Sequence, residues 1–203
     1  MFGLTKKDIG SILAISEIDA ILIFIIAKNI ALKIPFHPAL IFILLPVVSI
    51  CGFIFLSFFR EKIRILWQFA KFLLIGTLNT FVDLGVLNAL IFFSGIASGI
   101  YFPLFKAISF AVANINSYFW NKHWTFAGEG SKKAPQEFGI FFIVSIGGLV
   151  INVLSASFIV NIIGPQFGLT PEIWANIGGI CASFIGMAWN FIGYKIVVFK
   201  KIT

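Results

Sequence analysis

Residues 69–94 read FAKFLLIGTLNTFVDLGVLNALIFFS, a long apolar run with one acidic residue, Asp83, near its middle. The hydrocarbon core of a bilayer is about 30 Å thick, and a helix needs roughly 20 apolar residues to cross it. The run therefore predicts a transmembrane helix. Applied to the whole chain, the same rule predicts six such helices, at 9–27, 38–59, 69–94, 101–121, 138–163 and 173–199.

The composition agrees with a protein that lies mostly in lipid. The chain has 203 residues, of which 60% are hydrophobic and 11% are charged. Soluble domains carry about 25% charged residues, and a single soluble core of this size could not bury so much apolar surface. The fold class is therefore predicted to be an all-α integral membrane protein, a six-helix bundle.

The basic residues indicate an orientation in the membrane. The net charge is +7, and most lysines and arginines lie before the first helix, in the second and fourth connections, and near the chain end. Lys71, at the start of the third helix, belongs with the second connection in this pattern. Cytoplasmic loops are enriched in Lys and Arg. The pattern thus predicts a multi-pass protein of the cytoplasmic membrane with both termini in the cytoplasm.

The first helix has two interpretations. Glu17 and Asp19 fall near the middle of 9–27, where a carboxylate is expensive if the helix crosses the bilayer. The segment could instead lie in the interface as an amphipathic helix. Two residues apart, the two acids cannot share one helical face, so at least one of them needs a polar partner or water.

The last four predicted helices contain a repeat. Residues 117–126 read SYFWNKHWTF and residues 190–199 read NFIGYKIVVF, so that Lys122 aligns with Lys195. Aligning the starts of the third and fifth helices places Asp83 on Asn152. Each copy is an in-out-in hairpin, and two copies of the same topology are related by an axis along the membrane normal.

This repeat resembles the GtrA-like family, whose members are four-helix proteins with a similar motif at the end of each hairpin. The segment FLLIGTLNTFVD at 72–83 also resembles the start of that family, and the likeness covers roughly 67–200. Ser117 departs from the usual Asn in the first motif. The resemblance implies a GtrA-like four-helix membrane domain at 67–203, with 1–66 as an additional N-terminal hairpin of unknown role.

The family resemblance also implies a function, the translocation of polyprenyl-phosphate-linked monosaccharides across the cytoplasmic membrane for cell-surface glycan modification. The module is similar to the membrane part of dolichyl-phosphate mannose synthases. This sequence has no accompanying glycosyltransferase domain and no Asp-x-Asp metal motif. The alternative is a non-transporting anchor or scaffold for a separate glycosyltransferase. A small ion or solute transporter is a third reading, for which no convincing ion site is visible.

Charged residues at two depths fit a lipid with a phosphate head. Lys122 and Lys195 lie within the paired motifs, at the cytoplasmic ends of the fourth and sixth helices, with Trp124 and Tyr194 nearby. They can bind phosphate or simply anchor the helices at the interface. Asp83 lies near mid-bilayer, where acids are rare and point to function. Its alternatives are a structural ion pair with Lys106 or a Lys106 side chain that extends outward alone.

Amides inside the predicted helices form the third group of candidates. Asn79 lies one turn before Asp83 on the same helical face. Such amides can bond sugar hydroxyls or can lock helices together, and Asn176 is a further amide of this kind. The residues predicted to bind substrate are Asp83, Asn79, Lys106, Asn114, Asn116, Lys122, Trp124, Asn152, Asn190, Tyr194 and Lys195.

Catalysis is not predicted. The sequence shows no nucleophile, no acid–base pair and no cluster with metal-ligand spacing, so we expect no enzyme activity, no metal and no cofactor. The expected partners are the polyprenyl-phosphate sugar lipid and the bilayer, with a glycosyltransferase as a candidate protein partner. Four helices are few to enclose a sugar head, which is compatible with a homodimer. Nucleic acid is not an expected partner.

Overall fold

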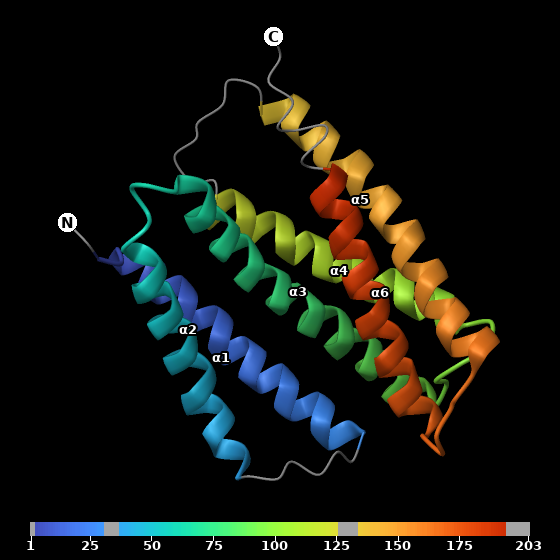
Figure 1. Cartoon of the computed structure of the whole chain (residues 1–203). Helices are drawn as coiled ribbons and strands as arrows, with labels where there is room; N and C mark the ends of the chain where they lie inside the picture. Colours follow the sequence, from blue (N-terminus) through green and yellow to red (C-terminus); the bar gives the residue numbers. More distant parts are fainter. Residues whose placement is uncertain (1–2, 31–36, 126–133, 194–203) are drawn as a thin grey trace. The chain divides into compact units, whose positions relative to one another are not determined.

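The computed structural model describes residues 3–30, 37–125 and 134–193, and within these ranges the regular structure is entirely helical. In the described ranges six α-helices follow one another (Figure 1). Their bounds are α1 Lys6–Asn29, α2 Ile41–Ser57, α3 Arg64–Ser94, α4 Phe102–Trp120, α5 Ala134–Ser157 and α6 Pro171–Gly193. A 3-10 turn, η1 Pro38–Leu40, precedes α2, and two π-helical turns, η2 Asn121–Thr125 and η3 Phe158–Ile163, follow α4 and α5.

The six predicted helices are all present, with shifted ends. Helix α3 begins at Arg64 and not at 69, because helical hydrogen bonding extends beyond the apolar run. Helix α4 ends at Trp120 and continues as the π-turn η2. The predicted end of the last helix, at 199, lies outside the described residues.

Three of the described helical segments are long and apolar enough to cross a membrane: Lys6–Asn29, Phe69–Ser94 and Ile143–Ile163. The first of them is α1, the segment with two interpretations from sequence. Helix α2 is apolar but shorter, and it continues through Pro46. The chain is therefore an all-α, multi-pass membrane protein, and for α2, α4 and α6 the crossing of the membrane stays a prediction.

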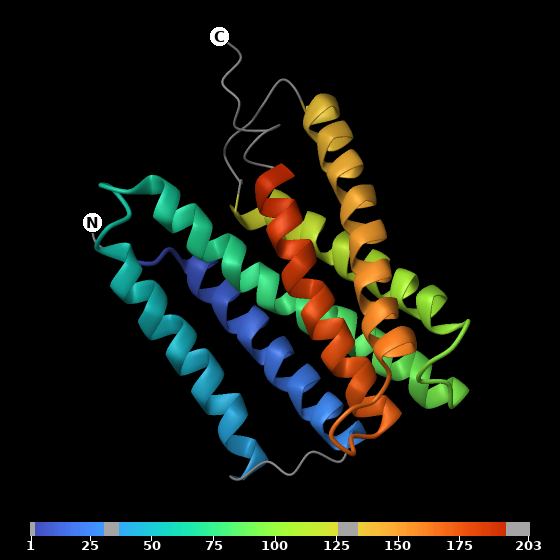
Figure 2. The same ribbon diagram turned by 45° about the vertical axis from the view of Figure 1, so that its right-hand side comes forward.

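The chain divides into two compact units, Met1–Gly85 with Ile115–Glu129, and Val86–Asn114 with Gly130–Thr203. The boundary predicted at 66/67 follows the family resemblance and stays a prediction. In the first unit α1 and α2 lie side by side as an antiparallel hairpin (Figure 2). The buried core of this unit comprises Ile12, Ile15, Phe53, Trp67, Ala70, Ile75, Leu78 and Trp124.

Local signals in the sequence explain how the first helix begins and where it packs. Thr5 caps α1, since its hydroxyl accepts from the Asp8 backbone N–H while the Asp8 carboxylate accepts from the Thr5 backbone N–H. Further along, a methyl group built on Gly85 of α3 would lie 2.9 Å from a side-chain carbon of Leu22 in α1. Helices α1 and α3 therefore approach closely near Gly85, and a larger residue there would force Leu22 to move.

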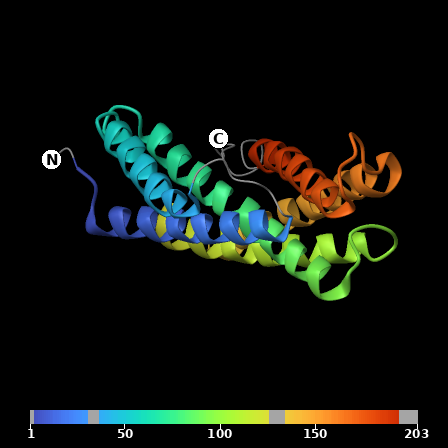
Figure 3. The ribbon, with the colours of Figure 1, turned by 90° about the horizontal axis from the view of Figure 1, so that it is seen from below.

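The second unit is built on the α5–α6 pair, which lie side by side (Figure 3). A methyl group built on Gly147 would lie 2.8 Å from the Trp189 ring, so the lack of a side chain permits this contact. The Trp189 indole N–H also donates to the Val144 carbonyl at 3.1 Å. Trp189 is thus a packing residue between α5 and α6.

Two hydrogen bonds connect the turn between α3 and α4 to η3. The Asn161 side chain accepts from the Gly99 N–H at 2.7 Å and donates to the Gly99 carbonyl at 3.1 Å. Gly99 has a φ of +85°, a conformation that favours glycine. The buried core of this second unit comprises Leu87, Ile91, Ala97, Phe102, Ala156, Val160, Trp174, Ala175 and Ala182.

Candidate functional site

Helix α3 carries polar side chains along the length of a candidate membrane span. Asn79 is half-buried, while Asp83 and Asn88 are only 2% and 4% exposed. Asp83 was predicted from its position in the apolar run, and its burial agrees with that position. Buried polar groups in a membrane helix need partners, so the contacts of this helix decide what each residue can do.

Two predicted residues of the first unit contact each other. The Asn116 side chain of α4 donates to the Asn79 side-chain oxygen of α3 at 2.7 Å. This hydrogen bond joins two helices, as the structural interpretation of the amides expects. Asn79 and Asn116 are therefore a pair that holds α3 against the end of α4, and a substrate would have to compete with this bond.

A second amide pair lies in the other unit. Asn88 of α3 and Asn176 of α6 exchange two side-chain hydrogen bonds, at 2.7 and 3.1 Å. Asn176 additionally donates to the Glu172 carbonyl at 2.9 Å. With so many of its polar atoms engaged, this pair has the features of a structural lock. Asn88 was not among the predicted residues, although it is an amide inside the same apolar run as Asn79 and carries the same signal.

Three other predicted residues are placed in the second unit. Lys106 of α4 is fully buried, and Asn114 in the same helix is half-buried. Asn152 of α5 is 1% exposed, and its side-chain oxygen has no hydrogen-bond partner among the described residues. Buried polar atoms without a partner are rare and call for an explanation. Asn152 is accordingly a strong candidate to accept a hydrogen bond from a ligand hydroxyl.

Of the two motif ends, the structure describes the first, where one of the predicted aromatic residues, Tyr118, contacts the lysine. Lys122 is exposed, and its ammonium lies 3.3 Å from the Tyr118 hydroxyl and 5.3 Å from the centre of that ring. Trp124 is 3% exposed and points into the core. In the second motif the Asn190 side chain, Tyr194 and Lys195 lie outside the described part of the structure.

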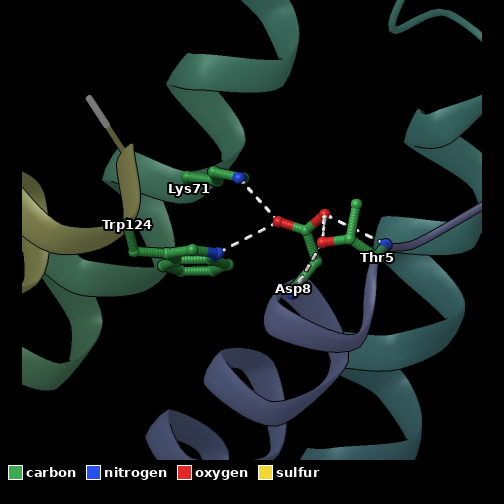
Figure 4. Close-up of polar contacts among 4 residues, drawn as sticks. All are labelled: Thr5, Asp8, Lys71 and Trp124. Atoms are coloured by element: carbon green, nitrogen blue, oxygen red, sulfur yellow. Dashed lines mark hydrogen bonds and ion pairs between the residues drawn. The ribbon is translucent and has the colours of Figure 1, made fainter. Parts of the chain in front are cut away.

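Trp124 instead takes part in a polar cluster that the sequence did not indicate (Figure 4). One oxygen of the buried Asp8 carboxylate accepts from the Lys71 ammonium at 2.6 Å and from the Trp124 indole N–H at 3.0 Å. The other oxygen accepts from the Thr5 hydroxyl at 2.7 Å and the Thr5 backbone N–H at 3.2 Å. We call Thr5, Asp8, Lys71 and Trp124 the Asp8 cluster.

Aromatic rings surround the ammonium of this cluster. The Lys71 Nζ atom lies 5.3 Å from the centre of the Trp67 ring and 5.0 Å from that of Trp124. The Arg60 guanidinium carbon also lies over the Trp67 ring, 5.4 Å from its centre. Ring faces attract cations electrostatically. The site therefore combines a buried cation, an indole donor and an oxyanion.

Lys71 has a burial and a partner that the sequence interpretation did not include. It was grouped with the basic connection that sets orientation, whereas it lies inside α3, is 8% exposed and forms an ion pair with α1. Asp8 was not considered at all. The available signal was the Thr5–Asp8 capping pattern, which marks a helix start but says nothing about a partner in another helix.

Asp19 is the second buried acid of α1. It is 5% exposed, and one carboxylate oxygen accepts from the Thr77 hydroxyl at 3.1 Å. The other oxygen has no hydrogen-bond partner in the described ranges. Glu17 is half-buried and, two residues before Asp19 on the same helix, does not share its face. Asp19 thus depends on one neutral hydroxyl, in contrast to the four donors around Asp8.

Comparison with known proteins gives the following similarities. The family described as "GtrA/DPMS, transmembrane domain" matches residues 71–199. An uncharacterized membrane protein of Bacillus subtilis (strain 168), YngA, is 31% identical over 140 residues, which are 69% of this chain and 82% of that protein. No solved structure matches the chain. The matched region begins at Lys71, so it includes Lys71 and Trp124 but neither Thr5 nor Asp8.

Proposed function

Because this chain belongs to the GtrA/DPMS transmembrane-domain family, we propose that it moves a polyprenyl-phosphate-linked monosaccharide across the cytoplasmic membrane. Family membership supports the broader statement that it is a membrane protein of lipid-linked sugar processing. The proposal adds the direction, from the cytoplasmic leaflet outward, and an orientation with both termini in the cytoplasm. The product would serve cell-surface glycan modification.

The burial of Asp83 is the observation on which this proposal depends most. The residue lies within Phe69–Ser94, a candidate membrane span that overlaps the family match from Lys71 onward, and is 2% exposed. A charged residue within a membrane span is expensive and by default indicates function. Lys106, in α4 of the same matched region, is fully buried as well. A protein that only anchors another enzyme does not require charges buried in its helices.

The chemistry of the substrate explains why such groups are needed. The isoprenoid tail can stay in hydrocarbon, but the phosphate and sugar cannot. Moving an ionised group unaided into a low-dielectric medium costs on the order of tens of kcal/mol in the idealised limit. Side chains that donate to phosphate and accept from sugar hydroxyls lower that cost. The charges of α3 and α4 and the spare acceptor of Asn152 are groups of this kind.

Substitution of Asp83 by Asn is expected to abolish the sugar modification of surface glycans in cells that depend on this protein. The change keeps the shape of the side chain but removes its charge. Glu172→Gln at the exposed start of α6 is the matched control and should leave the modification intact. The readout is the sugar composition of isolated surface glycan, with protein levels measured in the membrane fraction.

The scaffold alternative predicts a different result in the same cells. A scaffold would act through its cytoplasmic surface, for which the sequence candidate is 127–137, the connection before α5 together with the first residues of α5. Intact modification with Asp83→Asn, combined with loss of modification when 127–137 is replaced by a neutral linker, would contradict translocation. That result would favour a complex with a glycosyltransferase, to be sought by co-purification.

A further inference from the structure

The Asp8 cluster has the composition of an oxyanion-binding site whose ligand comes from the protein itself. Lys71 and Trp124 contribute only donors, an ammonium and an indole N–H. Both lie within the family match at 71–199, whereas the carboxylate that they bind belongs to α1, outside that match. The family domain therefore provides the donors, and the additional N-terminal segment provides the anion.

A phosphate oxygen makes the same contacts as a carboxylate oxygen. Ammonium groups and N–H donors bind both through short, charge-assisted hydrogen bonds. The proposed substrate carries a phosphate that must be recognised before its sugar can move. The carboxylate oxygen bound by Lys71 and Trp124 stands where a phosphate oxygen would be held by the same two donors.

The π-turn that carries Trp124 offers further polar groups. Thr125 and Asn121 are 7% and 8% exposed, and the Thr125 hydroxyl and the Asn121 side-chain oxygen have no hydrogen-bond partner in the part of the chain that the structure describes. Buried polar atoms without partners are exceptional, and π-helical turns occur frequently at functional sites. The Thr125 hydroxyl, on the residue that follows Trp124 in η2, is a group that a larger anion could use and that Asp8 does not.

We propose that Lys71 and Trp124, with Thr125 as the residue after Trp124 in η2, bind the phosphate of a polyprenyl-phosphate lipid, and that Asp8 occupies this site when no lipid is bound. The proposal rests on the proposed function, since it assigns the phosphate of that substrate to a place. Asp8 is then an internal competitor. The lipid has to displace the first turn of α1 or turn the Asp8 side chain away, so the site is open only part of the time.

The Asp8→Asn variant is expected to bind the lipid more tightly than wild type. When Asp8 occupies the site for part of the time, the apparent lipid affinity equals the intrinsic affinity multiplied by the fraction of time for which the site is open. Loss of the competing charge should therefore lower the apparent dissociation constant about tenfold. The probe is geranylgeranyl phosphate, titrated into the purified full-length protein in detergent and followed by tryptophan fluorescence. The double variant Asp8→Asn, Lys71→Gln should lose the gain.

Two control ligands define what is bound. Geranylgeraniol, which has the same tail and no phosphate, should bind wild type and Asp8→Asn equally. Inorganic phosphate should show the same order of variants at much higher concentrations if the head alone is recognised. Tight binding of free phosphate by Asp8→Asn, without any advantage for the lipid, would overturn the assignment to a lipid.

The unfolding temperature, measured with and without the lipid, distinguishes a change in lipid binding from a loss of folded protein. Asp8→Asn leaves Lys71 without its counter-ion, so the variant should unfold at a lower temperature, and geranylgeranyl phosphate should raise that temperature more than it does for wild type. Thr5→Ala is a milder variant that removes one donor to Asp8 and should tighten lipid binding to a smaller extent. Equal lipid affinity of wild type and both variants would overturn the proposal.

Failure of this inference and failure of the proposed function give different results. Wild-type transport in liposomes combined with unchanged lipid affinity in Asp8→Asn would contradict only the site. Tighter lipid binding by Asp8→Asn without transport by any form would leave the phosphate site in place and contradict translocation.

Discussion

Replacement of Lys71 by Gln is expected to lower the free energy of unfolding by about 3–5 kcal/mol, because the buried Asp8 carboxylate then loses its cation. The Lys71 and Asp8 side chains are only 11% and 4% exposed, so water cannot take the place of the missing charge. Trp67 and Trp124 also lose the cation between their rings. For a chain of this size the melting temperature in detergent should fall on the order of 10 °C.

The double variant separates the ion pair from general damage. Asp8→Asn together with Lys71→Gln leaves a neutral polar pair, and it should be clearly more stable than Lys71→Gln alone. Lys62→Gln, at an exposed position before α3, controls for the loss of one positive charge. If Lys71→Gln and Lys62→Gln had the same melting temperature, the Lys71–Asp8 ion pair would contribute nothing to the stability of the fold.

Asp19→Asn is expected to change stability in the opposite direction, raising the free energy of unfolding by about 2 kcal/mol. The Asp19 carboxylate is 5% exposed and has one hydroxyl partner, Thr77. Asparagine can accept the same hydrogen bond without carrying a charge. The measurement is again the melting temperature of the purified protein in detergent.

Asp8→Asn provides the matched comparison, since it is the same substitution in the same helix. It should destabilise, because it removes the partner of a buried lysine, whereas Asp19→Asn should stabilise. If both substitutions lowered the melting temperature to a similar extent, Asp19 would have a charged partner or bound cation, and its interpretation as an uncompensated acid would be wrong.

The helices could be predicted from the sequence because a membrane helix requires a continuous apolar run of about 20 residues, which can be recognised without knowledge of the fold. Apolar runs of the required length predicted all six α-helices, including α1 in spite of Glu17 and Asp19. The start of α3 could not be placed, since residues 64–68 are helical yet contain polar side chains. An apolar-run criterion counts residues that prefer lipid, whereas a helix continues for as long as its backbone hydrogen bonds are made.

Side-chain partners were much harder to predict. Asp83 could be predicted because it is a single acid in an apolar run. The Asn79–Asn116 hydrogen bond fits the helix-locking role that the sequence allows for such amides. The Asp8 cluster could not be predicted, because it joins α1, α3 and η2, whose contact no local pattern records. Lys71 lies near a predicted helix end, where a lysine is typical of a cytoplasmic loop, and its sequence position does not indicate that its side chain is buried.

The most direct test of translocation is a transport measurement with pure components. Wild-type protein is reconstituted into liposomes that contain a labelled polyprenyl-phosphate monosaccharide, and an impermeant reagent reports the lipid in the outer leaflet over time. We predict that the inner-leaflet lipid becomes accessible much faster than in protein-free liposomes, and that Asp83→Asn, but not Glu172→Gln, removes the acceleration. An accessibility time course equal to that of protein-free liposomes, for several different sugars, would contradict translocation by this protein.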